Sequence, residues 1–206
     1  MTTRIAIITG STRPGRRTGT VATWAFEAAQ RHPAVDAGAA SVDLVDLADY
    51  RLPLLDERLP PKYGQYEHDH TRTWAETIGG YDGFVFVTPE YNHSMPAALK
   101  NAIDYLFTEL NDKAAGFISL GVDGGTRAAE HLRLTLAEVK VATVRTQVIV
   151  PVFTDFEFTD PTNPTDPGTL APSDHRERRL HTLLGEVIAW SNALQPLRRV
   201  ESEVRT

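Results

Sequence analysis

A loop rich in glycine, hydroxyl and guanidinium groups lies at residues 10–19, between an apolar run and a helical pattern. It reads G-S-T-R-P-G-R-R-T-G. A helix amino terminus leaves free N–H donors and carries partial positive charge, so it favours an anion such as phosphate. The loop therefore predicts an anion-binding cup, although a tight turn with solvated arginines is the alternative. The side chains that would add hydroxyl donors and charge are Ser11, Thr12, Arg13, Arg16, Arg17 and Thr18.

Two better-known phosphate loops do not match this stretch. A P-loop needs Lys and then Ser or Thr after its second glycine, where this chain has Arg16 and Arg17. The glycine spacing also departs from the G-x-G-x-x-G motif of dinucleotide-binding proteins. The residues that would contact an anion are therefore not fixed by either pattern.

A second candidate loop, T-P-E-Y-N-H-S-M-P at residues 88–96, follows another apolar run. Its two prolines restrict the backbone, so its N–H and C=O groups can be held toward a planar heterocycle. Pro89, Glu90, Tyr91 and Asn92 are the candidate binding residues. The alternative is a proline-capped strand end, with Glu90 solvated and Asn92 serving as a turn residue.

The third candidate loop, S-L-G-V-D-G-G-T-R at residues 119–127, contains three glycines. Glycine has no Cβ, so the backbone at Gly121, Gly124 and Gly125 can approach a ligand closely. Asp123 is the polar candidate in the same loop. A glycine-assisted turn with Asp123 beside the following helix would explain the same residues without a ligand.

Buried strands alternate with helical patterns and would position these loops. Apolar runs predict strands at Arg4–Thr9, Gly83–Thr88, Ala115–Gly121 and Thr143–Val150, and the alternation V-D-L-V-D-L predicts one at Ser41–Leu47. Five strands with intervening helices predict an α/β fold, a doubly wound parallel sheet with helices on both faces. Ligands bind such sheets beyond the carboxyl ends of the strands, where the three loops lie. Alternation alone leaves the strand order open.

Apolar spacing of three and four residues predicts the helices. They are expected at Thr20–Arg31, at Thr71–Ile78, from Pro96 through Leu110, at Ala128–Val139 and from Ser173 to Leu194. The stretch 153–172 is rich in Pro, Thr, Asp and Gly and predicts a loop excursion. We expect one domain over residues 1–206, with a frayed tail at 196–206.

Composition excludes several classes of function. The 206 residues include no cysteine, which removes thiol catalysis, disulfides and iron–sulfur ligation. The net charge of −6 gives no global positive field for nucleic acid or anionic lipid. A short amino-terminal apolar run and the lack of a membrane-length one favour a cytoplasmic location. The segment His68-Asp69-His70 lacks the spacing of a metal site and predicts a polar loop.

In this order and on this scaffold, the three loops resemble those of the NADPH-dependent FMN reductase family, which includes quinone, azo-dye and chromate reductases. The resemblance covers about residues 4–150. It places the FMN phosphate on Ser11 and Arg13 of a G-S-x-R loop, with Thr18 as a later hydroxyl residue. The most specific signature is P-E-Y-N at residues 89–92, followed by Pro96 and L-K-N-A-I-D at residues 99–104. Gly121, Gly124, Gly125 and Arg127 match the second loop that the family uses at the flavin ring.

The resemblance implies a flavodoxin-like fold with bound FMN, which accepts a hydride from NADH or NADPH and passes electrons to a small acceptor. Because the cofactor performs that chemistry, we nominate no catalytic acid or base and no metal site. The acceptor would be free flavin, a quinone, an azo compound or a metal oxyanion, with a partner monooxygenase as one user of reduced flavin. Family members imply a homodimer or a dimer of dimers, to which the helix after P-E-Y-N contributes contacts.

Two other readings stay open at this point. One is a flavodoxin-like electron-transfer protein without nicotinamide activity, although such carriers have a threonine-rich phosphate loop where this chain has arginines. The other is a flavin-free α/β protein that binds another nucleotide or phosphorylated ligand. The unusually basic run from Arg13 to Thr18 also leaves open which of Arg16, Arg17 and Thr18 touches phosphate.

Overall fold

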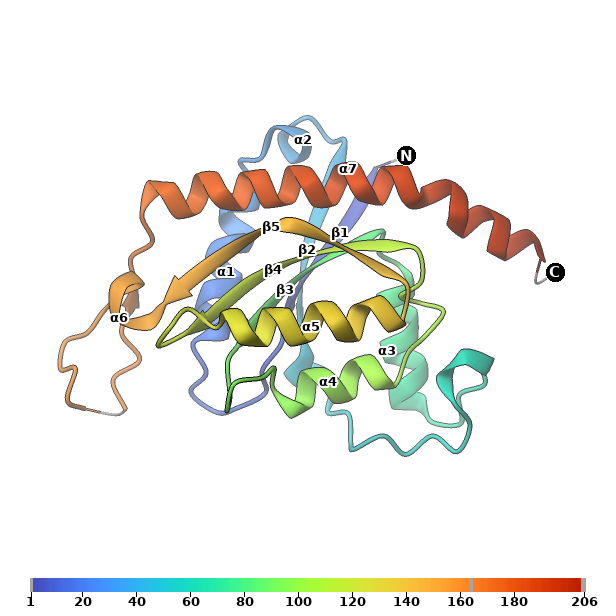
Figure 1. The fold of residues 1–206 in the computed structure, drawn as a ribbon, viewed down its shortest axis with the longest axis horizontal. Helices are drawn as coiled ribbons and strands as arrows, with labels where there is room; N and C mark the ends of the chain where they lie inside the picture. Colours follow the sequence, from blue (N-terminus) through green and yellow to red (C-terminus); the bar gives the residue numbers. More distant parts are fainter. Residues whose placement is uncertain (1, 164, 205–206) are drawn as a thin grey trace.

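The structure is a computed structural model that describes residues 2–163 and 165–204. Its main sheet has five parallel strands in the order β2-β1-β3-β4-β5 (Figure 1). This is the flavodoxin-like order, with a switch point between β1 and β3. The predicted flavodoxin-like α/β fold is therefore confirmed. The strands are β1 (Thr3–Thr9), β2 (Ala40–Asp46), β3 (Gly83–Pro89), β4 (Lys113–Gly121) and β5 (Val141–Pro151).

Helices cover both faces of the sheet, as Figure 1 shows. Successive residues of a strand point to opposite faces, so Ile5 and Ile7 pack toward α1 and α7, while Ala6 and Ile8 pack toward α3, α4 and α5. Both apolar layers are thus built from the same β-branched runs. The longer helices are α1 (Thr18–Ala29), α3 (Asp69–Gly79), α4 (Ala97–Asp104), α5 (Thr126–Glu138) and α7 (Asp174–Val204).

Short elements complete the described chain. They are α2 (Pro33–Asp36), the 3-10 turns η1 (Leu47–Tyr50) and η2 (Pro61–Tyr63), α6 (Val152–Asp155), and the hairpin strands β6 (Phe156–Glu157) and β7 (Thr169–Leu170). The segment 153–172 is therefore not all loop as predicted. Phe156 is buried, and the buried Asp155 carboxylate accepts a hydrogen bond from Arg176 Nε at 2.8 Å, which fixes this hairpin to α7.

Two helix ends and the start of a third helix differ from the predictions. The last helix passes through Pro196 to Val204 instead of ending at Leu194, and Arg198 anchors it by donating to Asp82 Oδ1 at 2.7 Å. The tail that we expected to fray is thus helical through Val204, and 205–206 lie outside the described residues. The helix after Pro96 ends at Asp104, not at Leu110 as predicted. Leu106 and Leu110 are spaced like helix residues because both are buried, although they lie beyond the helix. Asp69 and His70 begin α3 instead of lying in a polar loop.

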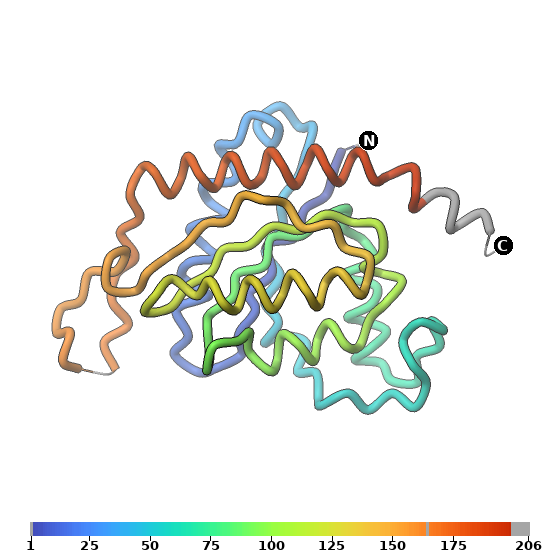
Figure 2. Tube along the Cα trace, viewed as in Figure 1, coloured from blue at the N-terminus to red at the C-terminus, as the bar shows by residue number. Residues whose placement is uncertain are grey.

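The amino-terminal strand lies against the last helix along one edge of the molecule. Figure 2 shows the amino terminus beside the second half of α7, where Thr3 Oγ1 donates to Asn192 Oδ1 at 2.6 Å. No helix in the described ranges is long and apolar enough to cross a bilayer. The carboxyl ends of the strands lie at the opposite edge and carry the three candidate loops.

Candidate functional site

The first two candidate loops touch through the hydroxyl of Tyr91. This hydroxyl is hydrogen-bonded to Ser11 Oγ at 2.9 Å and accepts from Arg13 Nε at 3.2 Å. Ser11 Oγ also accepts from the Arg13 N–H at 3.3 Å. The order β1-β3 in the sheet places these loops side by side, because both leave the carboxyl edge. The structure therefore brings Ser11, Arg13 and Tyr91 together.

The first loop ends in a cup at the amino terminus of α1. Thr18 is fully buried, and its Oγ1 has no hydrogen-bond partner among the described residues. The helix makes no side-chain cap, and its first hydrogen bond is from the Val21 N–H to the Arg17 carbonyl at 3.1 Å. The N–H groups before Val21 thus face the cup as free donors. A buried hydroxyl beside free N–H groups is the arrangement that an anion would satisfy.

The three arginines of this loop have different partners. Arg16 Nη2 pairs with Asp46 Oδ2 at the end of β2. Arg17 donates to the carbonyls of Asp166 and Pro167, each at 2.8 Å, and so points to the segment between β6 and β7. Arg13 is exposed and makes no ion pair within the described residues. Of the three guanidinium groups, that of Arg13 is therefore the one left without a carboxylate or carbonyl partner.

The second loop contains a tight two-residue turn that was not predicted. Tyr91 and Ser94 exchange backbone hydrogen bonds at 2.9 and 3.1 Å, and the residues between them, Asn92 and His93, have φ of 50° and 66°. Positive φ at both central residues is typical of a type I′ turn, and asparagine and histidine are among the non-glycine residues that adopt this conformation most often. Its exposed tip carries two left-handed residues whose side chains and N–H groups are free to meet a ligand.

Glu90 joins the second loop to the third. Its carboxylate accepts from the Arg127 N–H at 3.1 Å and from Arg127 Nη1 at 2.6 Å, and the side chain is only 11% exposed. Burial opposes ionisation of this carboxyl, but the hydrogen bonds and charge of Arg127 outweigh it and hold the pKa of Glu90 below its ordinary value. Glu90 was predicted to contact a ligand, whereas its carboxylate is engaged by Arg127. It positions the two loops relative to each other.

The glycines of the third loop are required by the loop's own packing. Gly124 and Gly125 have φ of 78° and 70°, and a Cβ at these positions would lie 2.2 Å from the Ile149 side chain and 2.5 Å from the Leu120 carbonyl. Two buried hydrogen bonds stabilise the turn: Ser119 Oγ donates to the Gly124 carbonyl at 2.6 Å and accepts from Gln147 Nε2 at 2.8 Å. These buried contacts fix the backbone that Gly121 presents.

A notch of about 230 Å³ separates the second and third loops. One wall carries Glu90, Asn92 and His93, and the other carries Gly121 and Asp123. The Asp123 carboxylate is largely exposed and lies 3.5 Å from Arg127 Nη1. Because Gly121 and Gly125 have no side chains, the backbone of the third loop can approach the edge of a flat ring in the notch.

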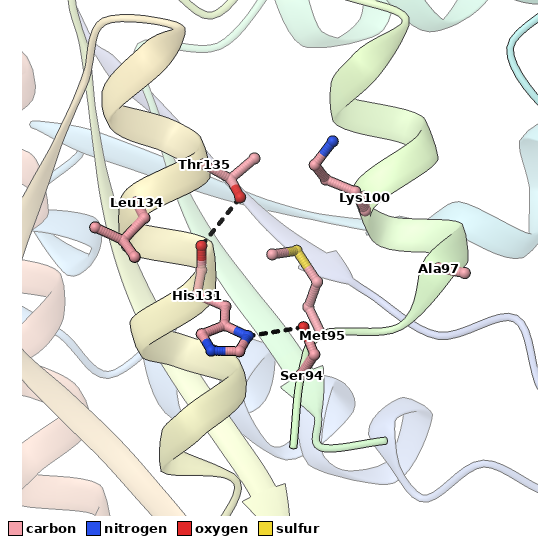
Figure 3. Close-up of a pocket in the computed structure, with 7 residues that line it drawn as sticks. All are labelled: Ser94, Met95, Ala97, Lys100, His131, Leu134 and Thr135. Atoms are coloured by element: carbon pink, nitrogen blue, oxygen red, sulfur yellow. Dashed lines mark hydrogen bonds between the residues drawn. The ribbon is translucent and has the colours of Figure 1, made fainter. Parts of the chain in front are cut away.

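A larger hollow of about 500 Å³ lies on the other side of the second loop, between α4 and α5. Figure 3 shows His131 of α5 pointing to Ser94, with His131 Nδ1 2.9 Å from Ser94 Oγ. Met95 and Leu134 supply apolar walls, and Leu134 is 74% exposed. The two helices therefore leave an open apolar groove beside the loop.

Comparison of the sequence with known proteins agrees with this geometry. The profile of a family described as NADPH-dependent FMN reductase matches residues 3–155. The chain belongs to this family. The match covers β1 through β5 and therefore includes all three loops.

Two relatives in the family align with 65% and 72% of this chain. An NAD(P)H-dependent FMN reductase of Schizosaccharomyces pombe is 42% identical over 135 residues, which are 65% of this chain and 65% of that protein. A Nectria enzyme of the same description is 34% identical over 72% of this chain and 75% of its own length. A flavoenzyme NAD(P)H:(acceptor) oxidoreductase from Paracoccus denitrificans has the same fold, with a TM-score of 0.68 and 18% identity, covering 93% of this chain and 98% of that one.

The residues at the edge of the sheet fit the FMN that the family name implies. The unsatisfied Thr18 hydroxyl, the free helix N–H groups and the unpaired Arg13 suit a phosphate. The notch between the second and third loops suits a ring edge. The two features lie on loops joined through Tyr91, as a single ligand with a phosphate at one end and a ring at the other requires.

Three features of the site were not identified from the sequence. Arg127 was noticed only as part of a motif, and its pairing with Glu90 needs two loops that are far apart in the chain. The positive φ of His93 left no signal, since the common marker of such a turn is Asn-Gly, whereas this chain has Asn92 and His93. The supporting Gln147 could have been flagged as a polar residue within an apolar strand.

Proposed function

We propose that the protein binds FMN at the carboxyl edge of its sheet and uses it to pass electrons from NADH or NADPH to a small acceptor. The observation that carries this proposal is the buried Thr18 hydroxyl without a protein partner, at a helix amino terminus that Arg13 flanks. Leaving such a group unsatisfied costs stability, so a ligand that satisfies it is the physical reason to keep it.

The phosphate would be held by Ser11, Arg13, Thr18 and the first N–H groups of α1. Arg16 already shares its charge with Asp46, so its role in the cup is to hold the loop and to add positive potential. Arg17 is directed away from the cup by its two carbonyl partners. We therefore assign the main cationic contact of the phosphate to Arg13.

The ring would lie between residues 89–92 and the third loop. The type I′ turn presents Asn92 at the notch, Tyr91 links the ring side to the phosphate side, and Gly121, Asp123, Gly124 and Gly125 form the opposite wall. Bound FMN supplies hydride acceptance from the nicotinamide and electron donation to the acceptor. The residues of this chain hold the ring edge, and the Glu90–Arg127 pair keeps the two walls at a fixed separation.

The acceptor would be free flavin, a quinone, an azo compound or a metal oxyanion. Relatives of this chain include a quinone reductase of Escherichia coli, 48% identical over 30% of this chain and 36% of its own length, and an NADPH azoreductase of a Bacillus species. Small flat acceptors such as these would suit a site that is open to solvent. A homodimer or dimer of dimers, and a partner monooxygenase that uses reduced flavin, belong to the same proposal.

The alternative is an electron carrier of the same fold that receives electrons from a protein. The arginine-rich cup and the family of NAD(P)H-dependent relatives favour the enzyme. An absorption spectrum of the purified protein with added FMN, followed anaerobically by NADH and then NADPH, separates the two. Flavin that stays with the protein and bleaches with a nicotinamide supports the enzyme. Binding without bleaching supports the carrier, and no binding contradicts both.

The assignment of the phosphate contact is tested by Arg13→Ala. Loss of a charged hydrogen bond should weaken FMN binding by about 2 kcal/mol, while riboflavin, which has no phosphate, should bind the variant and the wild type alike. Fluorescence titration measures both affinities. Arg145→Ala, at an exposed arginine of β5, is the matched control. Equal FMN affinity in Arg13→Ala and wild type would remove Arg13 from the cup.

A further inference from the structure

A hollow of about 590 Å³ lies outside the site described above, between the outer face of α1 and the hairpin of β6 and β7. Thr20, Thr23, Trp24 and Glu27 line it from the helix, and residues 168–170 line it from the hairpin. The helix residues are spaced by three, one and three, so they form one stripe along two turns. The hollow therefore starts at the first turn of α1, next to the cup.

Arg17 stands at the junction between the cup and this hollow. It is the residue before α1, and its bonds to the carbonyls of Asp166 and Pro167 bring the hairpin against the start of the helix. Its guanidinium also lies 5.2 Å from the centre of the Phe158 ring and 5.9 Å from that of Phe156. Its Nη1 makes no hydrogen bond to another described residue. The Nη1 donor and the positive charge of Arg17 are thus held between the cup and the hollow.

The cup lies between the ring notch and the hollow. Ser11 and Arg13 contact the second loop through Tyr91, whereas Arg17, at the other end of the same loop, contacts the hairpin. Along the helix axis, Thr18 and Trp24 are separated by about 9 Å, at 1.5 Å per residue. A ligand held at its middle by the cup can therefore extend in both directions.

The side chains of the hollow suit a nucleoside. Trp24 is half-buried, and an indole face stacks on a base. The Glu27 carboxylate makes no ion pair within the described residues and would accept a hydrogen bond from the amino group of the base. Thr20 and Thr23 add hydroxyl donors on the side nearer the cup.

We propose that this hollow is an adenosine subsite and that the cup accepts FAD as well as FMN. The flavin and its first phosphate would bind as in the proposed function, on which this inference rests. The second phosphate would lie beside Arg17, and the adenosine would run along α1 with its ribose at Thr20 and Thr23 and its base on Trp24, next to Glu27. NADH carries the same adenosine diphosphate, but its nicotinamide would have to pass the occupied cup to reach the ring notch.

Fluorescence titration of the full-length apo-protein with FMN and with FAD tests the subsite. Wild type should bind FAD at least as tightly as FMN. Trp24→Ala should weaken FAD binding about tenfold, the loss expected for one stacked base, and leave FMN affinity within about twofold. Thr23→Phe, at an exposed helix position that faces the hollow, should block FAD to a similar extent without a folding cost. Trp190→Ala, at a tryptophan on α7 that is 48% exposed, should change neither affinity.

The outcomes separate this inference from the proposed function. FMN binding with FAD at least tenfold weaker in wild type overturns the subsite and leaves the proposed function standing. Equal effects of Thr23→Phe on FMN and FAD also overturn the subsite. Failure of both flavins to bind overturns the proposed function itself. A lower NADH affinity of FMN-loaded Thr23→Phe, with FAD binding unchanged, would assign the hollow to the electron donor and overturn the FAD assignment.

Discussion

The two ends of the sheet use their cationic side chains differently. At the amino end, the buried Lys113 Nζ donates to the carbonyls of Ile78 and Gly79 at 2.9 and 3.2 Å, and Arg198 pairs with Asp82. At the carboxyl end, Arg13 has no carboxylate or carbonyl partner among the described residues, and it belongs to the loop that leads to the buried, unsatisfied Thr18 hydroxyl. A cation with protein partners contributes to the fold, whereas one without them is available to an anionic ligand.

We therefore expect substitutions at the amino end to change the free energy of unfolding and leave FMN binding intact. Substitutions at the carboxyl end should weaken FMN binding and leave the free energy of unfolding largely unchanged. Four substitutions test this division.

Arg198→Ala should have the largest effect on stability. The guanidinium is mostly buried, and it donates to Asp82 Oδ1 at 2.7 Å and to the Asp112 carbonyl at 2.8 Å. Its removal leaves a partly buried carboxylate without its partner, which should lower the free energy of unfolding by about 3 kcal/mol. Denaturant unfolding of the apo-protein measures this loss, and Arg198→Lys should recover part of it. A comparable loss of FMN affinity would contradict the division between the two ends.

Lys113 should make stability depend on pH at the same end. Burial, together with the nearby charge of Arg198, lowers the pKa of this lysine to about 7, although Asp82 and Glu109 oppose the shift. The pKa in the unfolded chain stays near 10.5. Between these values the unfolded chain binds more protons, so the free energy of unfolding rises with pH, by about 2 kcal/mol from pH 7 to pH 9.

Lys113→Met should remove that rise, because methionine does not titrate. Urea titrations of both proteins at several pH values give the comparison. If the free energy of unfolding has the same pH dependence in the wild type and in Lys113→Met between pH 7 and pH 9, then Lys113 stays protonated in the fold. Water would then reach its ammonium group more than the burial of Lys113 indicates.

Glu90→Gln should weaken the carboxyl end without unfolding the protein. The substitution removes the charge that holds Arg127, so the two walls of the notch lose their fixed separation. FMN and riboflavin affinity should each fall by about 2 kcal/mol, since the ring is affected and the phosphate is not. Glu130→Gln, at an exposed glutamate of α5, is the control. A loss confined to FMN would show that Glu90 acts through the phosphate.

Thr18→Val should give the smallest of the four effects. Removing a hydroxyl that donates to a phosphate should weaken FMN binding by about 1.5 kcal/mol, while the free energy of unfolding stays equal or increases. Ser191→Ala removes another buried hydroxyl that has no partner among the described residues, but at the side of α7 away from the cup. It should not alter FMN affinity. A stability loss in Thr18→Val with unchanged binding would make Thr18 a structural residue.

Much of the fold follows from local sequence patterns. The five strands were predicted to within a few residues, because the interior strands β1, β3 and β4 are apolar runs and the edge strand β2 alternates apolar and polar residues. The exceptions have local causes that the patterns hide. Leu106 and Leu110 are spaced like a helix but are buried in turns, and Pro196 is tolerated within α7 where Arg198 anchors the helix.

Local patterns in the sequence account for the kinds of elements, the three loops that follow β1, β3 and β4, and the residue types that could hold a phosphate and a flat ring. The strand order and the partner of each charged side chain depend on the tertiary structure. It turned Arg17 toward the hairpin, paired Arg16 with Asp46, and engaged Glu90 with Arg127. These partners lie far apart in the chain, and charged side chains on loops choose partners by proximity in space, which local propensity does not encode.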